Sequence, residues 1–309
     1  MAATIAAIDV GSNAIRLVVG ELDRHGDIKV VKKVREPVRL GEDVFAKGEI
    51  SRKTLEKALE SFKKFHRIMQ EHGVICSKAV ATSALREAAD RDLFIDEIKK
   101  ATGIQIEVIS GLEEGRLIFS AVENRINLRE QVSLLIDIGG GSVELTVADH
   151  GRPFATQTFK LGTVRLLQLL RERGLKEKHL RTVINENIEP VRIFLNSHKK
   201  RMQFDQAIGT GGNFECLGKL RVALLQKNSI FSISRDEIQR IVERLESMSM
   251  KERIHNLRLR PDRADVIIPA SLVTLAIMDA AEIDLLMVPY VGLRDGILSE
   301  ISAAQIAAK

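Results

Sequence analysis

The feature that most constrains the fold is a sequence pattern that occurs twice, at residues 5–20 and 134–149. Each copy has a run of apolar residues, one aspartate, a turn that contains glycine, and a segment in which apolar and polar residues alternate. Alternation on both sides of a glycine turn is typical of a β-hairpin. The two aspartates, Asp9 and Asp137, are 137 − 9 = 128 residues apart, which is the size of a domain. The repeat therefore predicts a duplicated domain with a ligand between the two copies.

The second hairpin has more glycines than a tight turn needs. Gly139, Gly140 and Gly141 have no Cβ atoms, so the backbone can approach a ligand closely and point successive N–H groups at an anion. Asp137 and Glu144 lie on the two sides of this turn, where two carboxylates suit a divalent cation that bridges to phosphate. An ordinary tight hairpin is the alternative interpretation of this segment taken alone.

The segments after each hairpin follow one order in the two halves of the chain. After the first hairpin we expect a strand over 27–34, a polar loop over 39–48 and a long helix over 51–73. Strands and helices then alternate through both halves, which indicates an α/β layered fold. Pro190 lies inside the helical pattern of 177–196 and predicts a break there.

The length of the chain and one polar stretch predict two domains. A chain of 309 residues corresponds to about two domains, and the polar residues 123–131 form the expected boundary. We therefore expect one domain over 1–124 and a second over 125–309, with a C-terminal helix that can also pack back on the first domain. The apolar face of residues 272–281 fits either the core or a homodimer interface.

Composition narrows the classes of function. The chain is 45% hydrophobic and 29% charged, as ordinary globular proteins are. No signal peptide is evident and no unbroken apolar run approaches about 18 residues, so we expect a cytoplasmic protein without a membrane partner. Trp is absent and Tyr occurs once, which leaves little for stacking on bases and disfavours a nucleic-acid partner. Cys76 and Cys216 lie outside any CxxC motif, so reduced structural thiols are expected. The histidines lack the spacing of zinc ligands, so a histidine zinc site is not expected.

Two kinds of segment could contact an anion outside the hairpins. Gly209, Thr210 and Gly211 follow a predicted strand and start a helix, which presents N–H groups and the positive end of a helix dipole to a phosphate. The basic runs 198–201 and 251–263 fit a solvated surface or a track for a long polyanion. Lys and Arg exceed Asp and Glu by 47 − 42 = 5, which permits an anionic substrate without proving one.

A pair of carboxylates and one arginine have two interpretations each. Glu113 and Glu114 lie near a predicted helix start, where they either complement the helix dipole or provide a general base for water. Arg86 is either a phosphate clamp, because guanidinium matches phosphate oxygens, or an ordinary surface arginine.

Taken together, these motifs resemble the exopolyphosphatase / guanosine pentaphosphate phosphohydrolase family, within the actin, sugar-kinase and Hsp70-like superfamily. The resemblance runs over nearly the whole chain, and the GGGSxE hairpin together with SGxEExR is its most specific part. The matching segments are IDVGSNAIRLVV (8–19), ATSALREA (81–88), ISGLEEGRLIF (109–119), LLIDIGGGSVELTV (134–147), GTGG (209–212) and GLRDG (292–296).

The resemblance implies a fold and a set of site residues. The fold would be α/β, with two ribonuclease H-like (actin-like ATPase) domains whose mixed sheets flank a cleft. Glu114 would be the general base, and Asp137 and Glu144 would hold Mg²⁺ (or another divalent cation) and the nucleophilic water. The positions that would contact phosphate are Ser12, Asn13, Arg86, Gly139, Gly140, Gly141 and Ser142. The chain resembles the short two-domain form, without the C-terminal HD-like domain of longer members, which leaves chain-length preference and processivity open.

We therefore expect metal-dependent hydrolysis of a terminal phosphoanhydride. Inorganic polyphosphate is the first substrate to consider, and guanosine pentaphosphate is the alternative because it presents the same terminal anhydride. Two other classes stay open: a small-molecule kinase or ATPase of the same superfamily, and a non-catalytic polyphosphate or nucleotide sensor.

Overall fold

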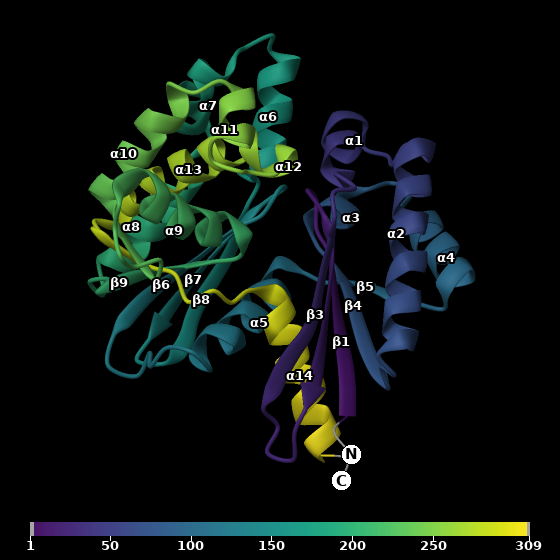
Figure 1. Cartoon of the computed structure of the whole chain (residues 1–309). Coiled ribbons are helices and arrows are strands. Elements are labelled where there is room, and N and C mark those ends of the chain that lie inside the picture. Colours follow the sequence, from purple (N-terminus) through teal and green to yellow (C-terminus); the bar gives the residue numbers. More distant parts are fainter. Residues whose placement is uncertain (1–2, 308–309) are drawn as a thin grey trace. The chain divides into compact units, whose positions relative to one another are not determined.

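The computed structural model describes residues 3–307 and divides them into two compact units (Figure 1). The first unit contains residues 3–121 together with 293–307, and the second contains residues 122–292. The chain passes from the first unit to the second between residues 121 and 122 and returns to the first between 292 and 293, and the domain boundary at residue 124 stays a prediction.

The first unit is built on a five-stranded mixed sheet with the order β3-β2-β1-β4-β5. β1, β2 and β3 form an antiparallel meander, and β4 and β5 continue the sheet parallel to β1. The C-terminal helix α14 lies along β1, so the first strand and the last helix belong to one unit (Figure 1). The strands are β1 (Ala3–Val10), β2 (Ile15–Leu22), β3 (Ile28–Glu36), β4 (Cys76–Ala81) and β5 (Ile106–Val108). The helices are α1 (Leu40–Lys47), α2 (Arg52–Glu71), α3 (Ser83–Glu87), α4 (Arg91–Thr102), α5 (Gly111–Glu123) and α14 (Leu293–Ala307).

Local sequence explains where the helices of the first unit begin. The Ser51 side chain accepts a hydrogen bond from the Thr54 N–H and caps α2, whose apolar face is buried, as predicted. The prediction of a polar loop over 39–48 is wrong, because this segment forms α1. Leu40 and Val44, four residues apart, bury one face of that helix, and a C-terminal glycine in the left-handed region ends it.

The second unit repeats the strand order of the first and adds one edge strand. Its sheet has the order β10-β11-β9-β6-β7-β8. Read from the other edge, β8-β7-β6-β9-β11 matches β3-β2-β1-β4-β5 in both order and direction. The strands are β6 (Val132–Ile138), β7 (Val143–Asp149), β8 (Arg152–Phe159), β9 (Gln206–Thr210), β10 (Ser232–Ser234) and β11 (Leu285–Met287). The predicted fold class, two ribonuclease H-like units with mixed sheets, is confirmed.

The helices of the second unit cover its sheet with one nearly all-apolar helix at the centre. The predicted break near Pro190 is confirmed, because α7 ends at Asn187 and Pro190 lies in the first turn of α8. Pro261–Ala281 is long and apolar enough to cross a membrane, but 78% of its most apolar window is buried inside the unit, as in a core helix. The helices are α6 (Thr163–Glu172), α7 (Leu180–Asn187), α8 (Glu189–Lys199), α9 (Gly212–Leu225), α10 (Arg235–Glu246), α11 (Met250–His255), α12 (Pro261–Ala264) and α13 (Ile267–Ala281), with a short 3₁₀ turn at Glu177–His179.

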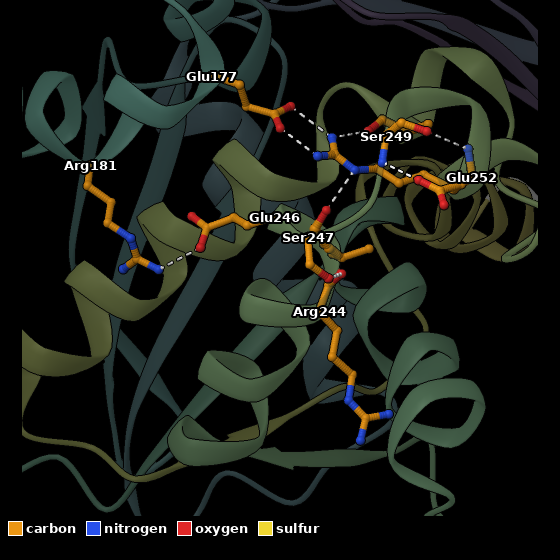
Figure 2. Close-up of polar contacts among 10 residues, drawn as sticks. Glu177, Arg181, Arg244, Glu246, Ser247, Ser249 and Glu252 are labelled. Carbon is orange, nitrogen blue, oxygen red and sulfur yellow. Dashed lines mark hydrogen bonds and ion pairs between the residues drawn. The ribbon is translucent and has the colours of Figure 1, made fainter.

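Part of each basic run serves internal contacts. Arg253 is buried, and its Nε donates to the Leu245 carbonyl. Its guanidinium also binds the carboxylate of Glu177, with one N–O distance of 2.8 Å; Figure 2 labels this glutamate and marks its contacts. Lys199 donates to the carbonyl of Ala280 near the end of α13. These two residues therefore stabilise the helical layer instead of facing solvent.

Candidate functional site

Two acidic side chains face each other across the hairpin of the second unit. The register of β6 and β7 pairs Asp137 with Glu144, and a carboxylate oxygen of one lies within 4.8 Å of a carboxylate oxygen of the other. Glu144 is only 2% exposed, so little water screens the repulsion between the two charges. The Thr210 hydroxyl donates to Asp137 Oδ1 at 2.8 Å and fixes that carboxylate. Two oxygen donors this close fit a divalent cation such as Mg²⁺, which would offset their repulsion.

The hairpin of the first unit has a cation in place of the second acid. The register of β1 and β2 pairs Asp9 with Arg16, and Arg16 Nη1 lies 2.7 Å from Asp9 Oδ2. Arg16 occupies the position that Glu144 has in the second hairpin, since 144 − 128 = 16. The first hairpin therefore neutralises its own aspartate, and its residues do not offer a cation the same pair of donors.

The N-terminus of α6 holds the glycine turn of the second hairpin. The Thr163 N–H donates to the Gly139 carbonyl at 3.1 Å, and the Val164 N–H donates to the Gly140 carbonyl at 2.8 Å. The peptide bonds of residues 3–307 are all trans, so the N–H groups that follow these carbonyls point away from α6. Within residues 3–307, the N–H groups of Gly140 and Gly141 make no hydrogen bond. The turn is thus built to present N–H groups to an anion.

The strand-to-helix loop after β9 lies against the same hairpin. Gly211 starts α9 with a φ of 80°, and a Cβ there would lie 2.9 Å from Asp137 Oδ1. The Asn213 side chain donates to the Ile138 carbonyl at 2.7 Å and so joins the loop to the hairpin. Packing explains the glycine at position 209, because a Cβ there would lie 2.3 Å from the Phe214 ring. The structure therefore brings 139–142 and 209–211 together around Asp137.

The two neighbouring glutamates of α5 have different surroundings. Glu114 is 5% exposed, and its Oε2 accepts a hydrogen bond of 2.9 Å from Arg86 Nη1. Arg86 Nη1 also donates to the Ile109 carbonyl at 3.0 Å. Glu113 instead is half-buried, and the hydrogen bonds from Arg116 hold the pKa of its carboxyl below the usual value. The buried, oriented carboxylate of the pair is Glu114.

The turn of the first hairpin contains a buried polar pair. Ser12 and Asn13 are both buried, and the Ser12 carbonyl accepts a hydrogen bond of 2.8 Å from the Gly41 N–H. The Ser12 hydroxyl has no hydrogen-bond partner in the part of the chain that the structure describes. A buried hydroxyl in this state is consistent with a polar ligand, and contact of Ser12 and Asn13 with phosphate stays a prediction.

Two residues that support the site, Gly162 and Asn213, were not among the site residues predicted from the sequence. Gly162 comes before α6, and a Cβ there would lie 2.3–2.4 Å from backbone atoms of Gly141 and Ser142. Asn213 belongs to the same group, and Arg263 donates a hydrogen bond to its side-chain oxygen. The overlooked signal is a second repeat, Leu-Gly at 40–41 and 161–162, which follows the third strand of each sheet.

Similar proteins have been described from several bacteria. Exopolyphosphatase 1 of Mycobacterium leprae is 25% identical over 301 residues, which cover 95% of this chain and 88% of that protein. The guanosine-5'-triphosphate,3'-diphosphate pyrophosphatase of Vibrio vulnificus is 27% identical over 302 residues, and this chain spans 59% of its length. The crystal structure of an exopolyphosphatase from Cytophaga hutchinsonii has a TM-score of 0.86 and 26% identity, with 97% of this chain and 98% of that chain covered.

The fold and the family agree. A crystal structure of the Aquifex aeolicus member of the Ppx/GppA family, at 23% identity and a TM-score of 0.76, has the same fold over 99% of both chains. The sequence model of the Ppx/GppA phosphatase family matches residues 18–304, which is most of the 309 residues. This chain belongs to the Ppx/GppA phosphatase family.

Proposed function

We propose that the protein is a metal-dependent exopolyphosphatase, which releases the terminal phosphate of inorganic polyphosphate by hydrolysis of a phosphoanhydride. The observation that carries this proposal is the second hairpin, where the buried pair Asp137 and Glu144 lies beneath a glycine turn with outward N–H groups. A site with two acids and backbone donors suits a substrate that is rich in negative charge and arrives with a cation. The family membership supports the same class of reaction.

In this proposal the glycine turn grips the terminal phosphoryl group. The N–H groups of Gly140 and Gly141 would donate to its oxygens, with further contacts from Ser142, Ser12 and Asn13. In the second unit, Gly209, Thr210 and Gly211 lie beside the turn, and Thr210 holds Asp137 in place. A divalent cation bound by Asp137 and Glu144 would supply charge neutralisation on phosphate oxygens.

Glu114 is the proposed general base, and Glu113 is not. A base for this reaction must accept a proton from the attacking water in one fixed geometry. The Glu114 carboxylate is buried and oriented by Arg86, whereas both carboxylate oxygens of the half-buried Glu113 accept hydrogen bonds from Arg116. In addition to orienting Glu114, the Arg86 guanidinium is proposed to contact a phosphate group of the substrate directly.

A second candidate substrate is guanosine pentaphosphate, which offers the same terminal anhydride. It is favoured by the similarity to the Vibrio vulnificus guanosine-5'-triphosphate,3'-diphosphate pyrophosphatase, of which this chain spans 59%. The similarity to exopolyphosphatase 1 of Mycobacterium leprae, of which the chain spans 88%, favours polyphosphate. A sensor or a small-molecule kinase of the superfamily remains the outcome if neither substrate is hydrolysed.

We also propose a cytoplasmic homodimer without nucleic-acid or membrane partners. The 47 basic against 42 acidic residues and the apolar composition of a globular protein support a freely diffusing enzyme for an anionic substrate. Light scattering on the purified protein would give the mass of a dimer, and the mass of a single chain of 34.4 kDa would contradict this part.

Phosphate release tests the proposal. The protein with Mg²⁺ is given long-chain polyphosphate, guanosine pentaphosphate, or ATP with sugars, and released phosphate is measured over time. Glu114→Gln should lower the rate about 10²- to 10⁴-fold, because it removes the base and keeps the size of the side chain. Glu113→Gln is the matched control and should keep the rate within about twofold. Equal rates for Glu114→Gln and wild type would show that Glu114 is not the base.

A further inference from the structure

One arginine of α6 binds the glycine turn through both its backbone and its side chain. The Arg165 N–H donates to the Gly140 carbonyl at 3.1 Å, and Arg165 Nε donates to the Gly141 carbonyl at 2.9 Å. Arg165 thus fixes two successive carbonyls of the turn, and the Nε contact adds a charge-assisted bond to those from the helix N-terminus.

The carbonyl that Arg165 Nε binds controls the next N–H group of the turn. In a trans peptide the carbonyl and the following N–H point in opposite directions, so fixing the Gly141 carbonyl fixes the direction of the Ser142 N–H. Gly141 has no side chain to restrict its own rotation, which makes this peptide plane easy to turn. On the carbonyl side two donors restrain it: the Gly162 N–H at 3.3 Å and the Arg165 guanidinium, whose Nε makes the shorter bond of 2.9 Å.

The first unit shows that the fold itself does not need this arginine. There the N-terminus of α1 also lies on the hairpin turn, and it is held by one bond from the Gly41 N–H to the Ser12 carbonyl at 2.8 Å. Arg165 is the third residue after Gly162, and the third residue after Gly41 is Val44, a buried core residue. The same packing of helix on hairpin therefore forms with an apolar residue at this position.

We propose that Arg165 is a positioning residue for phosphate binding: it holds the Gly141–Ser142 peptide with its N–H toward the substrate. This inference rests on the proposed function, because it assigns the turn to the terminal phosphate. Arg165 acts through the backbone, so what matters is its planar Nε–H as well as its charge. Its loss should leave the fold intact and misalign donors that stabilise the transferring phosphoryl group.

The test compares Arg165→Met and Arg165→Lys with Arg171→Met, which changes an exposed arginine in the last turn of the same helix. Both Arg165 variants should lower kcat for polyphosphate about 10- to 100-fold with a smaller change in KM, because long polyphosphate has other contacts. Arg171→Met should behave as wild type, and all three should melt within a few degrees of it. Full activity of Arg165→Lys would show that charge alone suffices and would overturn the proposal.

A binding measurement separates this inference from the proposed function. In the Glu114→Gln background, tripolyphosphate is titrated into ¹⁵N-glycine-labelled protein, and the amide signals of Gly140 and Gly141 are followed. We expect them to shift, and to shift less at equal ligand when Arg165 is Met. If wild type releases no phosphate but this difference appears, the hydrolytic function fails and the role of Arg165 stands. Identical shifts in the two proteins would refute the role of Arg165 whatever the activity.

Discussion

Asp9 and Asp137 occupy the same place in two copies of one sheet, but the residues that face them carry opposite charges. Asp9 lies opposite Arg16 and forms a 2.7 Å ion pair with it, whereas Asp137 lies opposite Glu144. The strand order and directions around the two hairpins are the same. The difference therefore does not come from the fold: one side chain decides whether a hairpin is neutral within itself or offers two carboxylates to a cation.

The helices that lie on the two hairpin turns also differ. In the first unit, α1 contributes one backbone hydrogen bond to the turn, from Gly41 to Ser12. In the second unit, Gly162 and the first residues of α6, Thr163, Val164 and Arg165, all donate hydrogen bonds to the turn. The second turn, which contains the three consecutive glycines, is therefore held more firmly where its own sequence is most flexible. The comparison teaches that the two copies share the fold, whereas only the second has the acidic pair and the firmly held glycine turn on which the proposed phosphate site depends.

The largest effect should follow from adding one methyl group beneath the second turn. In Gly162→Ala the new Cβ would lie 2.3–2.4 Å from backbone atoms, which must move, and the expected loss of unfolding free energy is about 1–3 kcal/mol. Phosphate release should fall at least about tenfold, because the turn is displaced. Gly41→Ala is the matched variant, where the nearest atom belongs to the Phe45 ring, which can rotate. Urea unfolding should show a smaller loss for Gly41→Ala, and an equal loss would contradict the difference between the two helices.

A smaller effect is expected from Asp9→Asn. The change removes the charge that faces Arg16 in a mostly buried ion pair, and we expect a loss of about 1 kcal/mol in unfolding free energy. The Mg²⁺ concentration needed for half-maximal phosphate release should stay the same, since Asp9 is already neutralised by Arg16. A several-fold higher requirement for Mg²⁺ would mean that the first hairpin also serves the cation.

The smallest effect is expected from an acid outside both hairpins. Partial burial acts to raise the pKa of Glu300, but hydrogen bonds and charges from Lys78 and Arg116 hold it below the usual 4.5. A carboxylate whose pKa is lowered by folding stabilises the protein at pH values above its pKa in the unfolded chain. This contribution is lost as the pH falls through its pKa in the folded protein. Glu300→Gln should thus cost about 0.2–1 kcal/mol at neutral pH and nothing well below pH 4.5. A cost that persists in acid would show that packing, not charge, is lost.

Much of this picture could be predicted from the sequence, because the features involved are local or repeated. The repeat around Asp9 and Asp137 predicted the duplication, and alternating strands and helices predicted the α/β class. The helix α1 was wrongly predicted as a loop, because its buried residue Val44 lies in a segment that is otherwise rich in charged residues. Arg253 could not be assigned to the interior, because its partner Glu177 is 76 residues away in the sequence.

The residues that support the site could not be identified from the sequence either, because their partners are also distant in the sequence. Arg165, Gly162 and Asn213 act on backbone atoms of a turn that lies far from them in sequence, and no side-chain pattern reports such contacts. The choice between Glu113 and Glu114 rested on resemblance, and the structure adds a physical distinction in the burial of Glu114 and its bond to Arg86.

The most direct test of the central claim is a Mg²⁺ titration by calorimetry, without substrate, on wild type, Glu144→Gln and Asp9→Asn. If the second hairpin alone offers a pair of acids to the cation, Glu144→Gln should weaken Mg²⁺ binding at least about tenfold, and Asp9→Asn should leave it within about twofold. Unchanged binding by Glu144→Gln, or equal weakening by both variants, would contradict the account.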